Sequence, residues 1–134
     1  HEDEALIYKL LYRSRQVAMV DGALYLYTAN QGGLMANRYT PERMTMLDIL
    51  DERLAFYREN GETGDLIRFT QNRQFMFAAE YYLHTADNKP FRRKARKKQW
   101  ALYWPLMRSS YWPRRKFVYT CAMLLPGHFK KLYF

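Results

Sequence analysis

The chain has 134 residues, which is enough for one domain with a moderate hydrophobic core but not for two ordinary domains. Apolar residues make up 49% of it, which excludes disorder caused by composition. The formal net charge is +9, and the single cysteine, Cys121, excludes an intrachain disulfide and a cysteine-based zinc site.

The charge is divided sharply along the chain. Residues 1–88 carry 9 Lys+Arg and 13 Asp+Glu, a net charge of −4. Residues 89–134 carry 13 Lys+Arg and no acidic residue, a net charge of +13. Such an asymmetry indicates two functional regions. The boundary falls at "HTADNKP", where Asn88 and Pro90 are typical of a turn that stops a helix.

The first region opens with a predicted helix and a predicted β-hairpin. Apolar side chains recur at one-face spacing over residues 2–15, which predicts a helix. Asp21 and Gly22 then form a common hairpin turn inside "VAMVDGALYLYT", so two short strands are expected over residues 17–28.

Two further helices are predicted before the charge boundary. Thr40 is expected to cap the first of them, with Pro41 as its first helical residue and an end at residues 60–61. The second is expected over residues 65–84, with these side chains on or near its buried face: Leu66, Phe69, Met76 and Leu83.

The second region is predicted to be broken into short helices by proline. Pro105 and Pro113 are expected to bound helical pieces at about residues 91–104, 106–111 and 114–125. The fold class is therefore mainly α with a small β-hairpin. We expect two or three packed helices up to about residue 88, followed by a loosely attached basic tail.

The opening "HEDE" has two interpretations. Acidic residues in the first turn stabilise a helix through its dipole, at about 0.3–1 kcal/mol each, and that role alone would explain them. A carboxylate at a helix start can also serve as a general base that takes a proton from an attacking hydroxyl.

The residues that follow favour the second interpretation. An acidic pair, an amphipathic helix, "VAMVDGALYLYTANQGGLMAN" and a helix rich in leucine and acids together resemble the C-terminal part of inverting family 2 glycosyltransferases of the GT-A type. The resemblance covers residues 1–60 well and residues 61–88 loosely. The basic tail is similar only in character to tails on bacterial cell-envelope members.

The resemblance assigns roles to individual residues. It implies that Asp3 is the catalytic base and that Glu2 helps to position the acceptor. Tyr25 and Tyr27 match a Tyr-rich strand near the acceptor and donor. The chain departs from the family where a basic residue often follows the last tyrosine, and Arg38 is the nearby candidate to replace it.

The resemblance also implies parts that this sequence does not contain. Family members hold a nucleotide sugar and a divalent metal in a preceding GT-A domain, and no Asp-x-Asp motif occurs here. We therefore expect a C-terminal fragment that is inactive alone and binds no cofactor. The parent enzyme would use Mg²⁺ or Mn²⁺ and transfer a sugar, with inversion, to a saccharide or lipid-linked acceptor in cell-envelope polysaccharide synthesis.

The basic tail has three interpretations. It is a solvated cationic face, a surface that docks on anionic membranes, or a nucleic-acid-binding segment. No nucleic-acid-binding motif is present, which disfavours the third. A peripheral location at the cytoplasmic face of the cell membrane fits the second, since interface-seeking aromatics accompany the cations. The expected membrane-binding residues are Arg92, Arg93, Lys94, Arg96, Lys97, Lys98, Trp100, Trp104, Trp112, Arg114, Arg115 and Lys116.

A non-catalytic helical module that binds a membrane or a partner remains the main alternative to the glycosyltransferase hypothesis. The glycosyltransferase hypothesis divides the chain into an acceptor-side helical and hairpin region at residues 1–88 and a basic aromatic amphipathic tail at residues 89–134.

Overall fold

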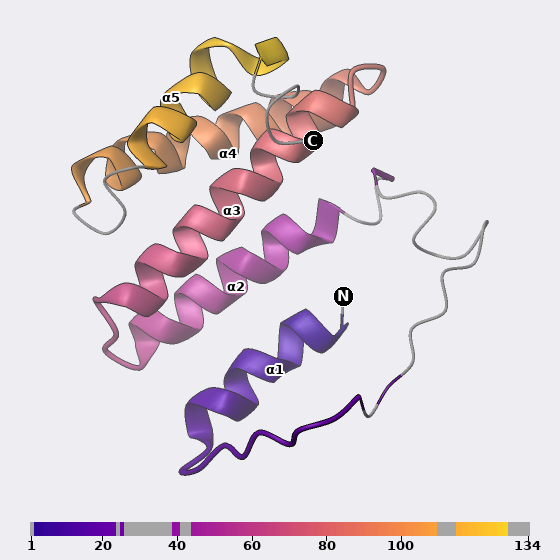
Figure 1. Cartoon of the computed structure of the whole chain (residues 1–134). Coiled ribbons are helices and arrows are strands. Elements are labelled where there is room, and N and C mark those ends of the chain that lie inside the picture. Colours follow the sequence, from indigo (N-terminus) through magenta and orange to yellow (C-terminus); the bar gives the residue numbers. More distant parts are fainter. Residues whose placement is uncertain (1, 24, 26–38, 41–43, 110–114, 129–134) are drawn as a thin grey trace.

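The protein is mainly α-helical. The computed structural model describes residues 2–23, 25, 39–40, 44–109 and 115–128 (Figure 1). Within these ranges no strand is formed, and the helices follow in the order α1 (Glu2–Arg13), α2 (Thr45–Glu59), α3 (Asp65–His84), α4 (Lys89–Arg108) and α5 (Arg115–Leu124). The mainly α fold class is confirmed.

Helix α3 is the central element. Helices α2 and α4 both pack along it, α1 lies against the outer side of α2, and α5 lies across α3 and α4 at the far end of the molecule (Figure 1). Three buried clusters follow from this arrangement. They are formed by Tyr8, Leu54, Tyr57 and Ile67 between α1, α2 and α3, by Met44, Leu47, Ala78, Tyr81 and Ala95 around α3, and by Phe75, Ala79, Leu102, Leu106, Tyr119, Ala122 and Met123 between α3, α4 and α5.

Local sequence signals fix several helix ends. Gly61 adopts a positive φ of 79° directly after the end of α2, a conformation that glycine reaches at little cost. The side chain of Asn88 accepts a hydrogen bond from the backbone N–H of Phe91 (3.4 Å), and Pro90 occupies the first turn of α4. The predicted bounds of the 65–84 helix are confirmed, and the predicted end of the preceding helix is confirmed at residues 60–61.

The β-hairpin prediction is wrong for its first strand. Residues 17–20 lie in irregular chain after α1, and Val17, Met19 and Val20 have exposed side chains. A strand is stable only when a neighbouring strand pairs with it and an apolar face is buried. Most of the predicted second strand lies outside the described residues.

The start of α2 also differs from the prediction. The helix begins at Thr45 and is preceded by Met44, whereas Thr40 was expected to be its cap. Met44 is almost fully buried against α3 and α4, so tertiary packing at this end fixes the start. Residues 41–43, which include Pro41, lie outside the described part of the chain.

Helix α4 runs without a break through Pro105, so the predicted division at this proline is wrong. A proline inside a helix removes one backbone donor and crowds the preceding turn. Leu102 and Leu106, one turn apart around Pro105, are both buried against α3 and α5. Their burial outweighs the local cost. Helices α4 and α5 of the basic region are packed into the core, so these described parts are not the loosely attached tail that was expected.

The buried face of α3 differs in part from the predicted one. Leu66 and Phe69 are 39% and 43% exposed, while Met76 and Leu83 are partly buried against the core, as predicted. Polar residues that were not assigned to the core take the missing places, namely Thr70, Asn72 and Gln74. Gln74 donates from Nε2 to the carbonyl of Leu47 (2.9 Å), which lets a polar side chain sit in the core.

Candidate functional site

The acidic residues at the start of α1 separate into an exposed carboxylate and a partly buried one. Asp3 is exposed, and its Oδ1 accepts a hydrogen bond from the backbone N–H of Glu4 (2.8 Å). That bond satisfies a backbone donor left free in the first helical turn, which agrees with the interpretation of these acids as stabilisers of the helix start. Glu2 is the first residue of α1, and its side chain lies outside the described part of the structure.

Glu4, to which the family resemblance assigns no role, ties three helices together. Its Oε2 accepts a hydrogen bond from Nη2 of Arg53 in α2 (2.9 Å), and its Oε1 pairs with Arg73 in α3. Arg53 is only 6% exposed, and its guanidinium lies 4.6 Å from the centre of the Tyr8 ring. In the sequence, Arg53 stands among the apolar residues Leu50, Leu54 and Tyr57 at helical spacing, and a charged residue in such a place is the signal for a buried pair.

Helix α1 therefore has two different faces. At roughly 100° per residue, Glu4, Tyr8 and Tyr12 share the face that packs on α2, where both tyrosine rings contact Phe56 and Tyr57. Asp3 falls on the opposite face. That face also carries Leu6, Ile7 and Leu10, and Leu11 lies at its edge, next to Glu4. These four apolar side chains are 49–56% exposed.

The pKa values of Lys9, Tyr12 and Tyr57 are raised where α1 packs on α2. Hydrogen bonding to Glu52 is the main cause that raises the pKa of Lys9 above its ordinary value. Burial is the main cause that raises the pKa of Tyr12 and of Tyr57, and the hydrogen bond from Tyr12 to Glu62 adds to the first of these. All three shifts arise where α1 meets α2 and the turn that follows it.

The predicted acceptor-side residues are not brought together within the described structure. Tyr25 has a side chain that is 80% exposed, in the irregular chain beyond α1. Tyr27 and Arg38 lie outside the described residues.

The cations of α4 divide into two sets on opposite flanks of the helix. On one flank, Lys94 pairs with Asp48 of α2 (Nζ to both carboxylate oxygens, 3.0 Å), and Lys98 pairs with Asp51. The other flank carries Arg92, Arg93 and Arg96, for which no carboxylate partner is found among the described residues. The predicted membrane-binding cations therefore do not form one uniform surface.

The unpaired flank surrounds an aromatic ring. The guanidinium carbons of Arg92 and Arg96 lie 4.4 Å and 4.9 Å from the centre of the Tyr82 ring, and Nη2 of Arg92 donates to the Tyr82 hydroxyl (3.2 Å). An open pocket of about 260 Å³ lies here. Its lining is Tyr82, Lys89, Arg92, Arg93 and Arg96, so every lining residue except the tyrosine is cationic.

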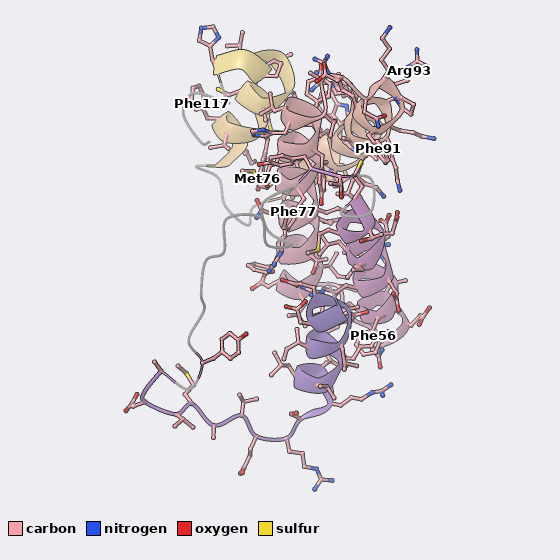
Figure 2. All side chains as sticks on the ribbon, turned by 90° about the vertical axis from the view of Figure 1, so that its right-hand side faces the viewer. Phe56, Met76, Phe77, Phe91, Arg93 and Phe117 are labelled. Carbon is pink, nitrogen blue, oxygen red and sulfur yellow. The ribbon has the colours of Figure 1, made fainter. Side chains whose placement is uncertain are left out.

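The same flank continues into tryptophan. Arg96 lies 5.7 Å from the Trp100 ring, and Trp100 and Trp104 are 48% and 57% exposed. Arg93 lies on the outer side of α4, and the exposed Phe117 of α5 lies on the opposite side of the molecule (Figure 2). The cations and tryptophans of α4 thus form one stripe, hereafter the Arg–Trp stripe, made of Lys89, Arg92, Arg93, Arg96, Trp100 and Trp104.

The remaining predicted membrane-binding residues add little to this stripe. Lys97 is exposed between the two flanks, and Lys116 is half-buried in α5. Trp112 and Arg114 lie outside the described residues, and so does the side chain of Arg115.

Comparison with known proteins gave no match: no family model, curated protein or solved structure is significantly similar to this chain. The resemblance to glycosyltransferases therefore rests on the residues quoted above. Across the described ranges, no helix has both the length and the apolar character needed to cross a membrane. Within the same ranges, no group of three or more His, Cys, Asp or Glu side chains is arranged to hold a metal ion.

Proposed function

We propose that this chain is the C-terminal, acceptor-side region of an inverting family 2 glycosyltransferase. The observation that carries the proposal is the exposed face of α1. Asp3, the acid that the family resemblance assigns as the base, shares this face with three half-exposed apolar side chains, Leu6, Ile7 and Leu10, and Leu11 extends it at one edge. Burying a leucine or isoleucine fully is worth about 1.5–3 kcal/mol, so a contiguous apolar face favours a covering surface.

A preceding GT-A domain is the proposed covering surface. Packed against the apolar face of α1, it would lie beside the Asp3 carboxylate at one end of that face. The carboxylate would then be close to a donor held by that domain while remaining open to an acceptor. Glu4, on the other face, would hold α1 on the helical bundle through Arg53 and Arg73.

The reaction proposed for the longer enzyme is a single displacement. Asp3 takes the proton from an acceptor hydroxyl, and the hydroxyl oxygen attacks the anomeric carbon of a nucleotide sugar with inversion. A divalent cation held by the preceding domain would neutralise the departing diphosphate. The described residues of this chain offer no ligand cluster for that cation, so their role is to supply the base and to support it.

The test is Asp3→Asn in the longer enzyme, assayed by release of nucleoside diphosphate from a panel of nucleotide sugars. General-base catalysis contributes about 10²–10⁴-fold, so kcat should fall by that factor while KM for the donor stays near its wild-type value. Glu59→Gln, an exposed carboxylate at the end of α2, is the matched control and should leave kcat unchanged. Wild-type kcat in the Asp3 variant would exclude it as the base.

The Arg–Trp stripe supports a second part of the proposal, that the region docks on an anionic membrane surface. Lys and Arg attract anionic headgroups, at about 1 kcal/mol each near the surface, and tryptophan prefers the interface. Vesicle co-sedimentation tests this part. Binding to anionic vesicles should survive moderate salt and weaken in Trp100→Ala/Trp104→Ala. Capture by an oligonucleotide instead would favour nucleic-acid binding, and membrane binding in a longer chain without transferase activity would favour a non-catalytic module.

A further inference from the structure

The pocket beside Tyr82 concentrates positive charge that the described residues leave unbalanced. The guanidinium groups of Arg92 and Arg96 lie within 5 Å of the same ring centre, and Lys89 and Arg93 complete the lining. The Tyr82 ring offsets part of the repulsion through cation–π contacts. The carboxylates of α2 neutralise Lys94 and Lys98 on the other flank and do not pair with this one. The pocket therefore has the electrostatics of an anion-binding site.

Part of the site is already organised for a ligand. Arg96 is held in place, since Nη1 donates to Oε1 of Gln99 (3.2 Å) and Nη2 donates to the carbonyl of Met123 at the end of α5. Nε of Arg92 is shielded from solvent and has no hydrogen-bond partner. A shielded donor without a partner carries a free-energy cost, and an oxyanion can accept this hydrogen bond only if the Arg92 side chain turns toward the pocket.

The size and donor set of the pocket select the ligand class. Its volume of about 260 Å³ lies below the roughly 300–1,000 Å³ typical of pockets that enclose a whole drug-sized ligand. Arginine forks match the geometry of phosphate oxygens. The pocket also lies at the N-terminal end of α4, where the helix dipole favours negative charge.

We propose that this pocket binds a terminal phosphate group that carries two negative charges, as in a diphosphate or a phosphomonoester. Arg92 and Arg96 are the fixed donors above Tyr82, and Lys89 and Arg93 close over the ligand from the outer side of α4. The group can belong to a soluble compound or to a lipid headgroup. The inference does not depend on glycosyl transfer, and it deepens the docking proposal, because four of the six residues of the Arg–Trp stripe line this pocket.

The test is isothermal titration of the chain with inorganic pyrophosphate at physiological ionic strength. We expect saturable binding at one site. Lys89→Gln/Arg93→Gln should weaken binding about tenfold or more, because two charge-assisted contacts are lost. Lys94→Gln/Lys97→Gln removes the same charge from the same helix outside the pocket and should change Kd by less than about twofold. Equal weakening in both variants would reveal diffuse attraction and overturn the proposal.

Vesicles distinguish the two sources of the phosphate. Phosphatidic acid presents a phosphomonoester, whereas phosphatidylglycerol presents a diester of lower charge. If pyrophosphate fails to bind but phosphatidic acid vesicles bind with the same dependence on Lys89 and Arg93, the source is a lipid headgroup. If neither probe gives pocket-dependent binding, the proposal is wrong.

Two further controls distinguish a loss of phosphate binding from a loss of folding and from a loss of catalysis. The substituted positions Lys89, Arg93, Lys94 and Lys97 are all exposed, and a melting temperature measured for each double variant verifies folding. If a double variant is unfolded, the single variants Arg93→Gln and Lys97→Gln replace the pair. Asp3→Asn should leave pyrophosphate affinity unchanged, so failure of the glycosyltransferase proposal and failure of this one are independent results.

Discussion

Arg53 of α2 donates from Nη2 both to the carboxylate and to the backbone carbonyl of Glu4 in α1, each at 2.9 Å. The side chain of Arg53 is 7% exposed and that of Glu4 is 22% exposed. Removing one partner of a shielded ion pair leaves the other charge without compensation. The pair therefore fixes α1 to the rest of the bundle, beside the exposed Asp3.

Glu4→Gln should lower the free energy of unfolding by about 1.5–3 kcal/mol, the usual contribution of a hydrogen bond to a charged group. Urea denaturation followed by circular dichroism measures the change. Asp3→Asn is the matched control one residue away and should unfold near the wild-type midpoint, because its carboxylate is exposed. The hypothesis that Glu4 anchors α1 fails if the two variants are equally stable.

Tyr119→Phe tests whether the C-terminal helix belongs to the core. The Tyr119 hydroxyl donates to Oδ1 of Asn72 in α3 (2.6 Å), and both side chains are buried. Loss of this hydrogen bond should cost about 1–2 kcal/mol in the free energy of unfolding. Tyr103→Phe breaks a longer bond to Thr120 (3.2 Å) in a partly exposed place and should cost less. A single cooperative transition in both variants is expected, and early melting of α5 alone would contradict a shared core.

The ends of the helices were predictable where local residues determine them. Asn60 and Gly61 end α2, and Asn88 caps α4, because capping depends on side chains within a few positions of the helix end. The unbroken path of α4 through Pro105 was not predictable from the same signals. It depends on the burial of Leu102 and Leu106 against helices that are distant in the sequence.

The buried face of α3 was hard to predict for a related reason. α3 packs against α2 and α4, and its cluster with α5 adds a third neighbour, so its apolar residues do not follow one stripe. Asn72 and Gln74 are buried with hydrogen-bond partners on other helices: Asn72 accepts from Tyr119, and Gln74 donates from Nε2 to Leu47, although its Oε1 has no partner.

In the candidate sites, too, local features were predictable from the sequence and contacts between distant residues were not. An acid at the start of a helix and a cationic run before tryptophan were visible in the sequence. The pairing of Lys94 with Asp48 joins residues 46 positions apart, so the division of the α4 cations required the fold. The Tyr82 pocket also required it, since the ring comes from α3 and the cations from α4.

The contact between α1 and α2 should weaken at alkaline pH. The pKa of Lys9 is raised in the folded state by Glu52, so its stabilising contribution is complete below its ordinary pKa of 10.5 and is lost as the pH rises through the folded value. The pKa of Tyr57 is raised mainly by burial, so above its ordinary value of 10.0 the unfolded state ionises first and is favoured. Both effects have the same sign.

Melting temperatures measured between neutral pH and about pH 11 check this prediction, since the window begins at the ordinary tyrosine pKa. The wild-type midpoint should fall as the pH rises above about 10. Tyr57→Phe should show a shallower fall, because the ionising group is gone. Tyr25→Phe, at a side chain that is 80% exposed, is the control and should follow the wild-type curve. Parallel curves for all three proteins would mean that Tyr57 does not contribute.

Pro105→Ala should stabilise the protein. Pro105 is exposed and lies within the last turns of α4, where it supplies no backbone donor. Alanine restores the donor and the helix propensity, which differs from that of proline by about 3 kcal/mol in a helix interior. Because the structure has already adapted to the ring, we expect a gain of about 1–2 kcal/mol. Pro90→Ala is the matched control in the first turn, where the missing donor costs nothing, and should give no gain. A loss of stability in Pro105→Ala would mean instead that the ring is a packing element of α4.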